Sequence, residues 1–481
     1  MNLAETLLAA GAPTHPCLIG PDGAPDCTYG ELRTKVNAVA ASISSTTKLG
    51  DRVAFTIGNR PEFVVAYLAT LLAGRVAVPL NHSAPRAEID RELAVVTPAA
   101  HFDAAAINQL IATSPETSFA AQSVDPDDVA VCLFTSGTAG APKAAMLTHG
   151  SLLANLQQVQ AAPGLAFQAT DITLGVLPLF HVFGLNVVLG LTLLQGATLS
   201  LVETFSPTRA AEQIMATNTT VVAGVPAMFQ AWLAVRESMT GNPFASVRLA
   251  VSGAAALDKR THGEFADRFA TNIYEGYGLT EASPIVSTTS VDRTVRMGSI
   301  GPPLPGVQIR LVATDGSDAL ADDPGEIWVK GPNVFKGYWN DPEQSAAVLT
   351  SDRWLKTGDI AVADRDGWLT LVDRSKDLII VSGFNVYPAE VEDALCEYVG
   401  VARAAVVGEP DDRSGEHIVA YVVAANHDDA PTPTQLIAHL RRRVARYKIP
   451  TRFEFVAELP QTFSGKVVRR DLRGVASAKP A

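Results

Sequence analysis

The chain has 481 residues, of which 47% are hydrophobic, and its 50 Asp and Glu against 38 Lys and Arg give a formal net charge of −12. This length exceeds what one ordinary hydrophobic core holds, so two or more domains are expected. The negative charge repels nucleic acid and anionic membrane surfaces, and it argues against a nucleic-acid partner.

Cysteine usage and the N-terminal residues predict a cytoplasmic protein. The four cysteines lack metal-ligand spacing, so neither a disulfide framework nor a zinc site is expected, and the first residues lack a basic signal region. Residues 182–202 are uncharged, but glycines and polar residues divide them into a buried helix, a turn and a strand. We therefore expect no transmembrane span, while peripheral membrane contact and a homo-oligomer stay open.

The first part of the chain alternates helix and strand patterns, which is typical of a layered α/β protein. Helices are predicted over residues 29–43 and 61–73, and strands over 52–57 and 76–80. Residues 103–128 are polar and weakly patterned, so a loose connection is expected there.

Residues 134–143 follow the apolar run 129–133 and combine glycines, hydroxyl side chains and a lysine. Glycines let backbone N–H groups approach an anion, and Lys143 adds a charge, so this loop is interpreted as a phosphate cradle. It is not a Walker loop, because Ala144 follows the lysine. The alternative is an ordinary surface turn. A helical pattern over 151–156 predicts that the loop joins a strand to a helix.

Further strand patterns end in small residues, at 172–177, 220–225, 247–253 and 273–278. Ligands in open α/β sheets lie beyond the carboxyl ends of the strands, so these ends predict the edge of a site. The residues that follow them are 178–181, 226–229, 253–256 and 277–281.

After residues 301–303 the sequence pattern changes to short strands separated by turns, such as 308–312 and 325–329. This pattern indicates a β-rich subdomain. A second change, to a small α+β pattern, begins in the charged run 373–377. Residues 1–373 are therefore predicted to form one domain and residues 374–481 another. A helical pattern over 435–447 contains the one short basic run, 441–443, which is interpreted as a solvated face.

Five motifs together resemble the adenylate-forming superfamily of acyl-CoA synthetases, peptide-synthetase adenylation domains and luciferases. In order, they are TSGTAGAPK at 135–143, YGLTE at 277–281, TGD at 357–359, DRSKD at 373–377 and SGK at 464–466. The resemblance covers nearly the whole chain, and residues 178–181 (PLFH) with the short region 325–359 look most like fatty-acid and aryl acid CoA ligases.

The resemblance implies an α/β fold, with a large N-terminal domain of layered sheets plus a β-rich subdomain and a small α+β C-terminal domain that rotates. It also implies an ATP-dependent acid–CoA ligase. In such enzymes a carboxylate attacks the α-phosphorus of ATP to give acyl-AMP and pyrophosphate, and coenzyme A then takes the acyl group. Both steps concentrate negative charge, so Mg²⁺ and a lysine are the natural catalysts.

The resemblance also assigns the nucleotide site. Glu281 would hold Mg²⁺ with Thr135, Tyr277 would stack on adenine, and Asp359 would accept the ribose hydroxyls. A helix-end charge is the alternative for Glu281, and a surface ion pair is the alternative for Asp359. The residues assigned to ATP or AMP are Thr135, Ser136, Gly137, Thr138, Gly140, Lys143, Gly253, Ala254, Ala255, Gly276, Tyr277, Gly278, Thr280, Asp359 and Arg374.

Catalysis is assigned by the resemblance to Lys466, with His181 near the carboxylate and pyrophosphate. Lys376 would be the hinge of the small domain. The CoA channel would involve Ser382, Gly383 and Phe384, and the acyl pocket Met228 and Phe229, although plain core packing explains Phe229 equally well. The sequence departs from the family at Ala139, Ala144 and Gln461, none of which removes a catalytic group.

A fatty or aryl acid is expected as substrate rather than an amino acid, because no acidic residue stands in the pocket segments to pair with an amino acid's ammonium group. Of the two, we expect a fatty acid. One alternative is a fatty acyl-AMP ligase that loads a carrier-protein thiol. Such enzymes carry an extra segment ahead of the hinge, and residues 325–373 leave no room for it. A second alternative is a non-catalytic acyl- or nucleotide-binding protein, against which the intact Lys466, Glu281 and Asp359 argue.

Overall fold

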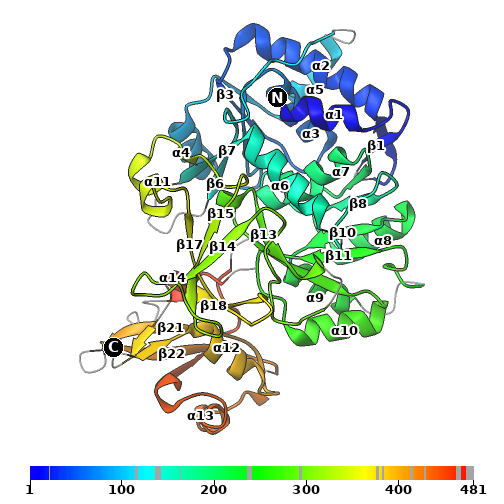
Figure 1. Ribbon diagram of the computed structural model, residues 1–481. Coiled ribbons are helices and arrows are strands. Elements are labelled where there is room, and N and C mark those ends of the chain that lie inside the picture. The colour runs from blue at the N-terminus through cyan, green and yellow to red at the C-terminus, as the bar shows by residue number, and fades with distance from the viewer. Residues whose placement is uncertain are drawn as a thin grey trace. The chain divides into compact units, whose positions relative to one another are not determined.

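The computed structural model of the protein is shown in Figure 1. It describes residues 1–20, 22–113, 118–135, 142–162, 164–235, 241–291, 295–374, 377, 379–381, 384–411, 415–426, 429–461 and 467–472. The chain forms two compact units, Met1–Ile309 with Val329–Lys356, and Arg310–Trp328 with Thr357–Ala481. The domain boundary expected between residues 373 and 374 lies inside the second unit and stays a prediction.

A six-stranded sheet in the first unit has the order β16-β7-β6-β4-β3-β5. Strands β5, β3, β4 and β6 are parallel, whereas β7 and β16 are antiparallel to their neighbours. The parallel strands are mostly buried, which explains their near-continuous apolar sequences. The bounds are β3 Arg52–Thr56, β4 Val76–Leu80, β5 Ala100–Phe102, β6 Val129–Thr135, β7 Lys143–Thr148 and β16 Gly337–Tyr338.

Helices α2, α3 and α5 pack against one another beside this sheet (Figure 1). The predicted helices at 29–43 and 61–73 are confirmed, and α2 starts with a capping box in which Thr28 and Glu31 bond each other's backbone N–H. The helices of this region are α1 Leu3–Ala10, α2 Tyr29–Thr46, α3 Pro61–Leu72, α4 Arg86–Val96, α5 Ala104–Thr113, α6 His149–Ala161 and α11 Pro342–Val348.

The expectation of a loose connection over residues 103–128 is wrong in its first half, where α5 lies. The helix has an apolar face, with Ile107 buried and Leu110 and Ile111 half-buried at i+3 and i+4, but the polar residues after it obscured this short pattern. It forms because alanine-rich sequence favours helix and because Asp103 Oδ1 accepts a 2.8 Å hydrogen bond from the N–H of Ala106.

An eight-stranded sheet in the same unit has the order β13-β12-β11-β10-β8-β9-β1-β2. The six inner strands, from β12 to β1, are parallel to their neighbours. The edge strands β13 and β2 are antiparallel to theirs. The four predicted strands between 172 and 278 are confirmed. The bounds are β1 Pro16–Ile19, β2 Pro25–Thr28, β8 Ile172–Gly175, β9 Thr198–Leu201, β10 Val221–Gly224, β11 Leu249–Ser252, β12 Ile273–Gly278 and β13 Ile285–Thr288.

Helices α8 Pro207–Thr217, α9 Pro226–Ala234 and α10 Lys259–Phe269 pack in sequence beside this sheet (Figure 1). Beneath α9 and α10 lies a cluster of aromatic rings whose centroids are 4.7–5.5 Å apart, most of them in edge-to-face geometry. Its members are Phe229, Trp232, Phe244, Phe265 and Phe269.

The uncharged segment 182–202 folds as a core element. It forms a π-helix η1 Phe183–Gly190, a short helix α7 Leu191–Leu194 and strand β9, as expected from its glycines. A Cβ added at Gly184 would lie 2.1 Å from the carbonyl oxygen of Pro178, so this position requires glycine. Within the described part of the chain, no helix is both long and apolar enough to span a membrane.

The β-rich region forms a four-stranded sheet of order β14-β15-β17-β18, which confirms the predicted change in pattern. Its strands are β14 Gln308–Val312, β15 Gly325–Lys330, β17 Leu355–Ala363 and β18 Leu369–Arg374. The described residues also include the short 3₁₀ helices η2 Thr280–Ala282, η3 Thr289–Val291 and η6 Arg446–Lys448.

The last part of the second unit is a five-stranded sheet with helices, which confirms the α+β pattern. Its core joins strands and helices through buried Ile379, Val391, Val406 and Leu436. The elements are β19 Ile379–Val381, β20 Phe384–Val386, α12 Pro388–Cys396, β21 Val401–Asp411, β22 Gly415–Ala424, α13 Pro433–Leu440, β23 Arg452–Phe455 and α14 Arg469–Leu472.

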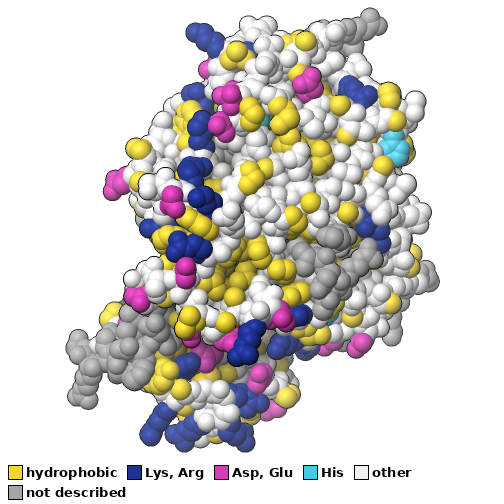
Figure 2. Space-filling model, in the orientation of Figure 1, with side chains coloured by type: hydrophobic (Ala, Val, Ile, Leu, Met, Phe, Trp, Pro, Cys, Tyr) yellow, Lys and Arg dark blue, Asp and Glu magenta, His cyan; other side chains and the backbone are white. Residues whose placement is uncertain are grey.

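The helix predicted over 435–447 is too long, because α13 ends at Leu440. The next three residues are arginines with exposed side chains, and they offer no apolar surface that would hold another turn against the core. Figure 2 shows Lys and Arg side chains gathered at the part of the surface where Figure 1 places α13. The interpretation of this basic run as a solvated face is confirmed.

Candidate active site

The predicted phosphate loop is the connection of a β-hairpin. Thr135 ends β6 and Lys143 begins β7, and their Cα atoms are partners in the antiparallel ladder. The expectation that the loop joins a strand to a helix is therefore wrong, since α6 begins only after β7. Register fixes Thr135 and Lys143 opposite each other. The loop residues Ser136, Gly137, Thr138 and Gly140 lie outside the described residues.

Lys143 is held in place by two neighbours. Its Nζ donates a 2.6 Å hydrogen bond to Oε1 of Gln344 on α11, and it lies 5.4 Å from the centroid of the Tyr338 ring. An ammonium over an aromatic face is attracted by the ring's negative π surface. The charge is thus fixed at the loop end of the hairpin, next to the predicted phosphate loop.

The carboxyl ends of the parallel strands bring together the predicted residues of the second sheet. Gly224 of β10 pairs with Ser252 of β11, and Ser252 pairs with Glu275 of β12. Gly253 and Gly276 therefore follow at the same edge. The structure confirms that these glycine-bearing ends lie side by side, with Tyr277, Gly278 and Thr280 just beyond them.

Ala254 departs from ordinary backbone geometry, because its φ is 70°. This left-handed conformation costs a non-glycine residue about 1–2 kcal/mol. Strain of this kind is found preferentially at functional sites, where the surrounding structure imposes it. Gly253, Ala254 and Ala255 form the start of the loop after β11, as predicted for a wall of the adenine site.

Phe183 lies at these strand ends, and the motifs in the sequence did not point to it. A Cβ placed on Gly253 would lie 3.0 Å from Cε1 of Phe183 and 3.4 Å from the carbonyl oxygen of Gly276, so the ring covers Gly253 at the strand ends. Phe183 N–H donates to Nδ1 of His181 at 3.3 Å, which brings the predicted His181 into the same region. The position of Phe183, two residues after the PLFH motif, is the feature of the sequence that could have indicated it.

Asn59 is a second residue that the sequence did not reveal. Its buried side chain donates to the carbonyls of Gly175 and Leu177 at 3.0 and 2.8 Å, and it accepts from the N–H of Leu179 at 3.0 Å. Asn59 follows β3 of the six-stranded sheet, whereas its partners follow β8 of the eight-stranded sheet. It therefore fixes the loop that carries His181.

Glu281 lies in the short helix η2 after β12, and several hydrogen bonds fix this loop. Tyr338 Oη donates to Glu281 Oε1 at 2.6 Å, and the N–H of Phe335 donates to the Glu281 carbonyl at 2.9 Å. Buried asparagines hold the residues that follow, because Asn333 donates to Ala282 O and Asn155 bonds both backbone groups of Ile285.

The oxygen donors at this position fit Mg²⁺. This ion prefers oxygen ligands and is commonly bound by one or two carboxylates together with substrate phosphates and water. The described residues contain no group of three or more His, Cys, Asp and Glu that would hold a metal by themselves. A single carboxylate at Glu281, with the hydroxyl of Thr135 at the end of β6, matches a site in which protein oxygens and substrate phosphates hold the ion together. These two metal assignments stay predictions.

Met228 and Phe229 lie in the first turn of α9, shortly after the end of β10. Phe229 is fully buried, and its ring packs edge-on against Trp232 and Phe265 in the aromatic cluster. A Cβ on Gly224 would lie 3.1 Å from Phe229 Cε2 and 3.6 Å from Met228 Sδ, so both side chains also contact the strand end. Phe229 is thus a core residue, and its role in an acyl pocket, like that of Met228, stays a prediction.

The predicted ribose ligand lies in the second unit. Asp359 is 9% exposed, and its N–H donates to Thr357 Oγ1 at 3.1 Å. Across the β17–β18 ladder, the Cα partner of Asp359 is Arg374, which agrees with the predicted pairing of their roles. Lys376, Ser382, Gly383 and Lys466, as well as the side chains of Arg374 and Phe384, lie outside the described residues.

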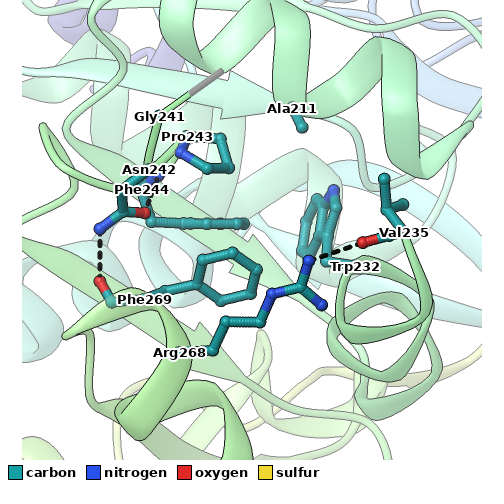
Figure 3. A pocket seen from close by; sticks show the side chains of 9 residues that line it. All are labelled: Ala211, Trp232, Val235, Gly241, Asn242, Pro243, Phe244, Arg268 and Phe269. Carbon is teal, nitrogen blue, oxygen red and sulfur yellow. Dashed lines mark hydrogen bonds between the residues drawn. The ribbon is translucent and has the colours of Figure 1, made fainter. Parts of the chain in front are cut away.

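A cavity of about 260 Å³ is separate from these strand ends (Figure 3). Phe244 precedes β11, and Arg268 and Phe269 precede β12, so the cavity lies toward the amino ends of the strands. Asn242 donates to Phe269 O at 2.7 Å and Arg268 to Val235 O at 2.6 Å (Figure 3). Ligands bind at the opposite end of such sheets, and we do not assign this cavity to the acyl group.

Comparison with known proteins agrees with the motifs. A model of the AMP-binding enzyme family matches residues 8–339, and a model of the AMP-binding enzyme C-terminal domain matches residues 390–466. A long-chain-fatty-acid–CoA ligase of Yersinia pestis is 35% identical over 429 residues, covering 89% of this chain and 71% of the relative. A feruloyl-CoA synthase of an Amycolatopsis species is 38% identical over 465 residues, with 93% of each chain covered.

The fold is also that of solved enzymes. The crystal structure of ATP-bound MatB from Rhodopseudomonas palustris has a TM-score of 0.92 and 30% identity to this chain, and 99% of both chains is covered. With family models spanning most of the chain, the predicted fold and cofactors are confirmed. The chain belongs to the AMP-binding enzymes of the adenylate-forming superfamily and is an AMP-forming acyl-CoA synthetase, an enzyme class that uses ATP, Mg²⁺ and coenzyme A.

Proposed function

We propose that this acyl-CoA synthetase activates a fatty acid. A carboxylate oxygen of the acid forms a bond to the α-phosphorus of ATP, and the bond to the β-phosphate bridge breaks with release of pyrophosphate. The thiol of coenzyme A then bonds to the acyl carbon, AMP leaves, and the thiol proton passes to solvent. Bound Mg²⁺ supplies charge neutralisation on the phosphates, and Glu281 and Thr135 would hold it.

The observation that carries this proposal is the apolar lining of the strand ends. Phe183 covers Gly253, and Met228 and Phe229 contact Gly224. The adjoining segments 182–191, 224–229 and 285–288 contain no Asp or Glu, so they offer no partner for the ammonium group of an amino acid. An apolar chain that enters such a lining gains about 0.8 kcal/mol for each buried CH₂.

A second candidate is an aryl acid. The feruloyl-CoA synthase relative matches this chain over 93% of both lengths, and the Phe183 ring offers an aromatic substrate an edge or a face. Both candidates share the adenylation chemistry and differ only in the shape of the acid.

An acid panel distinguishes the two. We expect AMP release with coenzyme A to rise from acetate toward palmitate, by about four-fold in kcat/KM for each CH₂ until the pocket is full. A maximum at ferulate or coumarate would favour the aryl acid instead. A preference for a free amino acid over the matching fatty acid would reject both candidates.

A matched pair of glycine variants tests the predicted acyl pocket. Gly224→Ala places a Cβ against Phe229 and Met228, so we expect the preferred acid to become shorter. Gly263→Ala, on α10, meets no atom within 4 Å and should leave the preference unchanged. An unaltered chain-length profile in Gly224→Ala would remove Met228 and Phe229 from the pocket.

We propose further that the small domain rotates about Lys376 between the two half-reactions, so that residues 382–384 reach coenzyme A. Lys376→Pro fixes φ and removes an N–H, and it should arrest the domain in one orientation. Pyrophosphate release without coenzyme A should then persist while thioester formation from supplied acyl-adenylate collapses. Ser375→Ala keeps backbone freedom and serves as the control. Two unchanged rates in Lys376→Pro would exclude rotation at this segment.

A further inference from the structure

Tyr338 is mounted rigidly beside the phosphate hairpin. Its Cα pairs with that of Ala145 on β7, and its N–H donates to Ser345 Oγ at 2.8 Å. The ring packs edge-on against Phe335, with centroids 5.0 Å apart. Only 7% of Tyr338 is exposed. Backbone pairing, a side-chain acceptor and an aromatic neighbour therefore fix both the position and the direction of its phenol.

The phenol of Tyr338 points at the predicted metal ligand. Its Oη donates to Glu281 Oε1 at 2.6 Å, a short distance typical of a hydroxyl that donates to a carboxylate. A carboxylate oxygen can only accept a hydrogen bond, so the Tyr338 hydroxyl is the donor in this contact and Glu281 Oε1 is the acceptor.

The Tyr338 ring also lies beside the lysine of the phosphate hairpin. Lys143 Nζ lies 5.4 Å from the ring centroid and donates to Gln344 Oε1 at 2.6 Å. Tyr338 therefore contacts, through one aromatic ring, both the cation predicted to bind phosphate and the carboxylate predicted to bind Mg²⁺. The sequence separates these partners by well over one hundred residues, and no motif joins them.

We propose that Tyr338 is a positioning residue that orients the Glu281 carboxylate for Mg²⁺ and sets its distance from Lys143. This inference rests on the proposed metal role of Glu281. A carboxylate with one oxygen already hydrogen-bonded has fewer orientations to lose when it binds an ion. Partners of this kind behind a metal ligand typically change metal affinity by about 10- to 100-fold.

The test removes one hydroxyl and keeps the ring. Tyr338→Phe retains the packing on Phe335 and the face offered to Lys143, but it cannot donate to Glu281. With a non-hydrolysable ATP analogue and no acid present, Mn²⁺ binding measured by calorimetry should weaken by roughly 10- to 100-fold. The Mg²⁺ concentration needed for half-maximal adenylation should rise by a similar factor, while kcat at saturating Mg²⁺ changes less.

Tyr29→Phe is the matched control. Tyr29 is also buried, and its Oη donates to Ala197 O at 2.8 Å, remote in sequence from the site motifs. Loss of this hydroxyl should lower stability by a similar amount without any change in Mn²⁺ affinity. Glu281→Gln should weaken Mn²⁺ binding at least as much as Tyr338→Phe.

Equal Mn²⁺ affinity in Tyr338→Phe and Tyr29→Phe would overturn the proposal, and so would unchanged affinity in Glu281→Gln. Because the acid is absent from the binding measurement, the result does not depend on whether the substrate is a fatty or an aryl acid. A failed acid assignment would therefore leave this test intact.

Discussion

Both sheets bring polar side chains to the candidate site, but from different kinds of strand. The six-stranded sheet presents them on antiparallel strands, whereas the eight-stranded sheet presents Glu281 and His181 in the loops that follow parallel strands, beside glycines and apolar side chains. Lys143 and Tyr338 lie on the antiparallel strands β7 and β16 of the first sheet. The second sheet contributes Gly253, Gly276 and the strained Ala254 at the ends of parallel strands. The contact of Tyr338 with Glu281 joins the two.

This difference follows from the two kinds of strand pairing. A hairpin projects neighbouring side chains from a fixed register, which suits point charges for phosphates. Parallel strands end together in short turns, so small residues there leave room for a flat base or an acyl chain. The following predictions test how far this division extends.

The largest effect is expected from the lysine of the SGK motif at 464–466, which lies outside the described residues. Lys466→Ala should slow acyl-adenylate formation by about 10²–10³-fold, because its ammonium group serves the transition state of that step. Thioester formation from supplied acyl-adenylate should stay near wild type. Single-turnover assays of each half-reaction measure this, and an equal loss in both would contradict the assignment of Lys466.

A pH-dependent effect is expected in the second sheet. Glu275 of β12 is buried and accepts from the N–H of Leu257 at 3.1 Å, and burial raises its pKa from 4.5 to about 7. Its folded pKa lies above its unfolded pKa, so the stability it contributes is full below about pH 4.5 and is lost as the pH rises through 7. The loss amounts to about 3 kcal/mol at most.

Urea denaturation at pH 5 and pH 8 checks this. Glu275→Gln should reduce the fall in unfolding free energy between the two pH values, whereas Glu264→Gln on the exposed side of α10 should keep the full fall. The part that stays in Glu275→Gln is expected from Glu92, whose pKa burial also raises to about 7. A fall of wild-type size in Glu275→Gln would place the titration elsewhere.

Adding a methyl group at Gly278 tests how closely the end of β12 packs against the loop that carries Glu281. In Gly278→Ala, the new Cβ would lie 2.0 Å from the Pro284 carbonyl oxygen, so the loop carrying Glu281 must shift. We expect a loss of about 1–3 kcal/mol in stability and weaker ATP binding. In Gly263→Ala the new Cβ meets no atom within 4 Å, so this variant should be neutral or slightly stabilising. Equal stability of the two variants would mean that the loop carrying Glu281 shifts without cost.

The smallest effect concerns backbone strain. Ala254→Gly relieves a left-handed φ that costs about 1–2 kcal/mol but adds about 0.5–1 kcal/mol of unfolded-state entropy. The protein should become more stable by about 0.5–1 kcal/mol. Ala255→Gly, the neighbour without a positive φ, should lower stability in the same thermal unfolding measurement. A lower stability in both would show that position 254 is not strained.

Much of the fold could be predicted because local sequence and tertiary structure agree. Thr28 and Glu31 cap α2, and the β-branched runs of β8 and β10 form strands where expected. The helix α5 was missed because its apolar face is short, Ile107 with Leu110 and Ile111, and is followed by a polar stretch without periodicity. The end of α13 was missed because the arginines that follow still have good helix propensity.

Candidate site residues could be named where a motif is continuous in sequence and not where it is interrupted, and their roles stay predictions. Lys143, Tyr277 and Glu281 stand in short motifs, whereas Asn59, Phe183 and Tyr338 act through partners more than fifty residues away. Single asparagine and tyrosine residues carry no local signal for such contacts. The phosphate loop was recognised from its composition, but its hairpin geometry depends on the pairing of β6 with β7.

The sequence by itself determined the enzyme family, the order of the motifs and the residue types that ATP chemistry requires, because each of these lies within a few consecutive residues. Only the tertiary structure decided that Tyr338 reaches Glu281 and Lys143, that Asn59 holds the loop of His181, and that Phe183 covers Gly253. These contacts arise from strand order and register across two sheets, which the packing of the whole unit fixes and no short segment encodes.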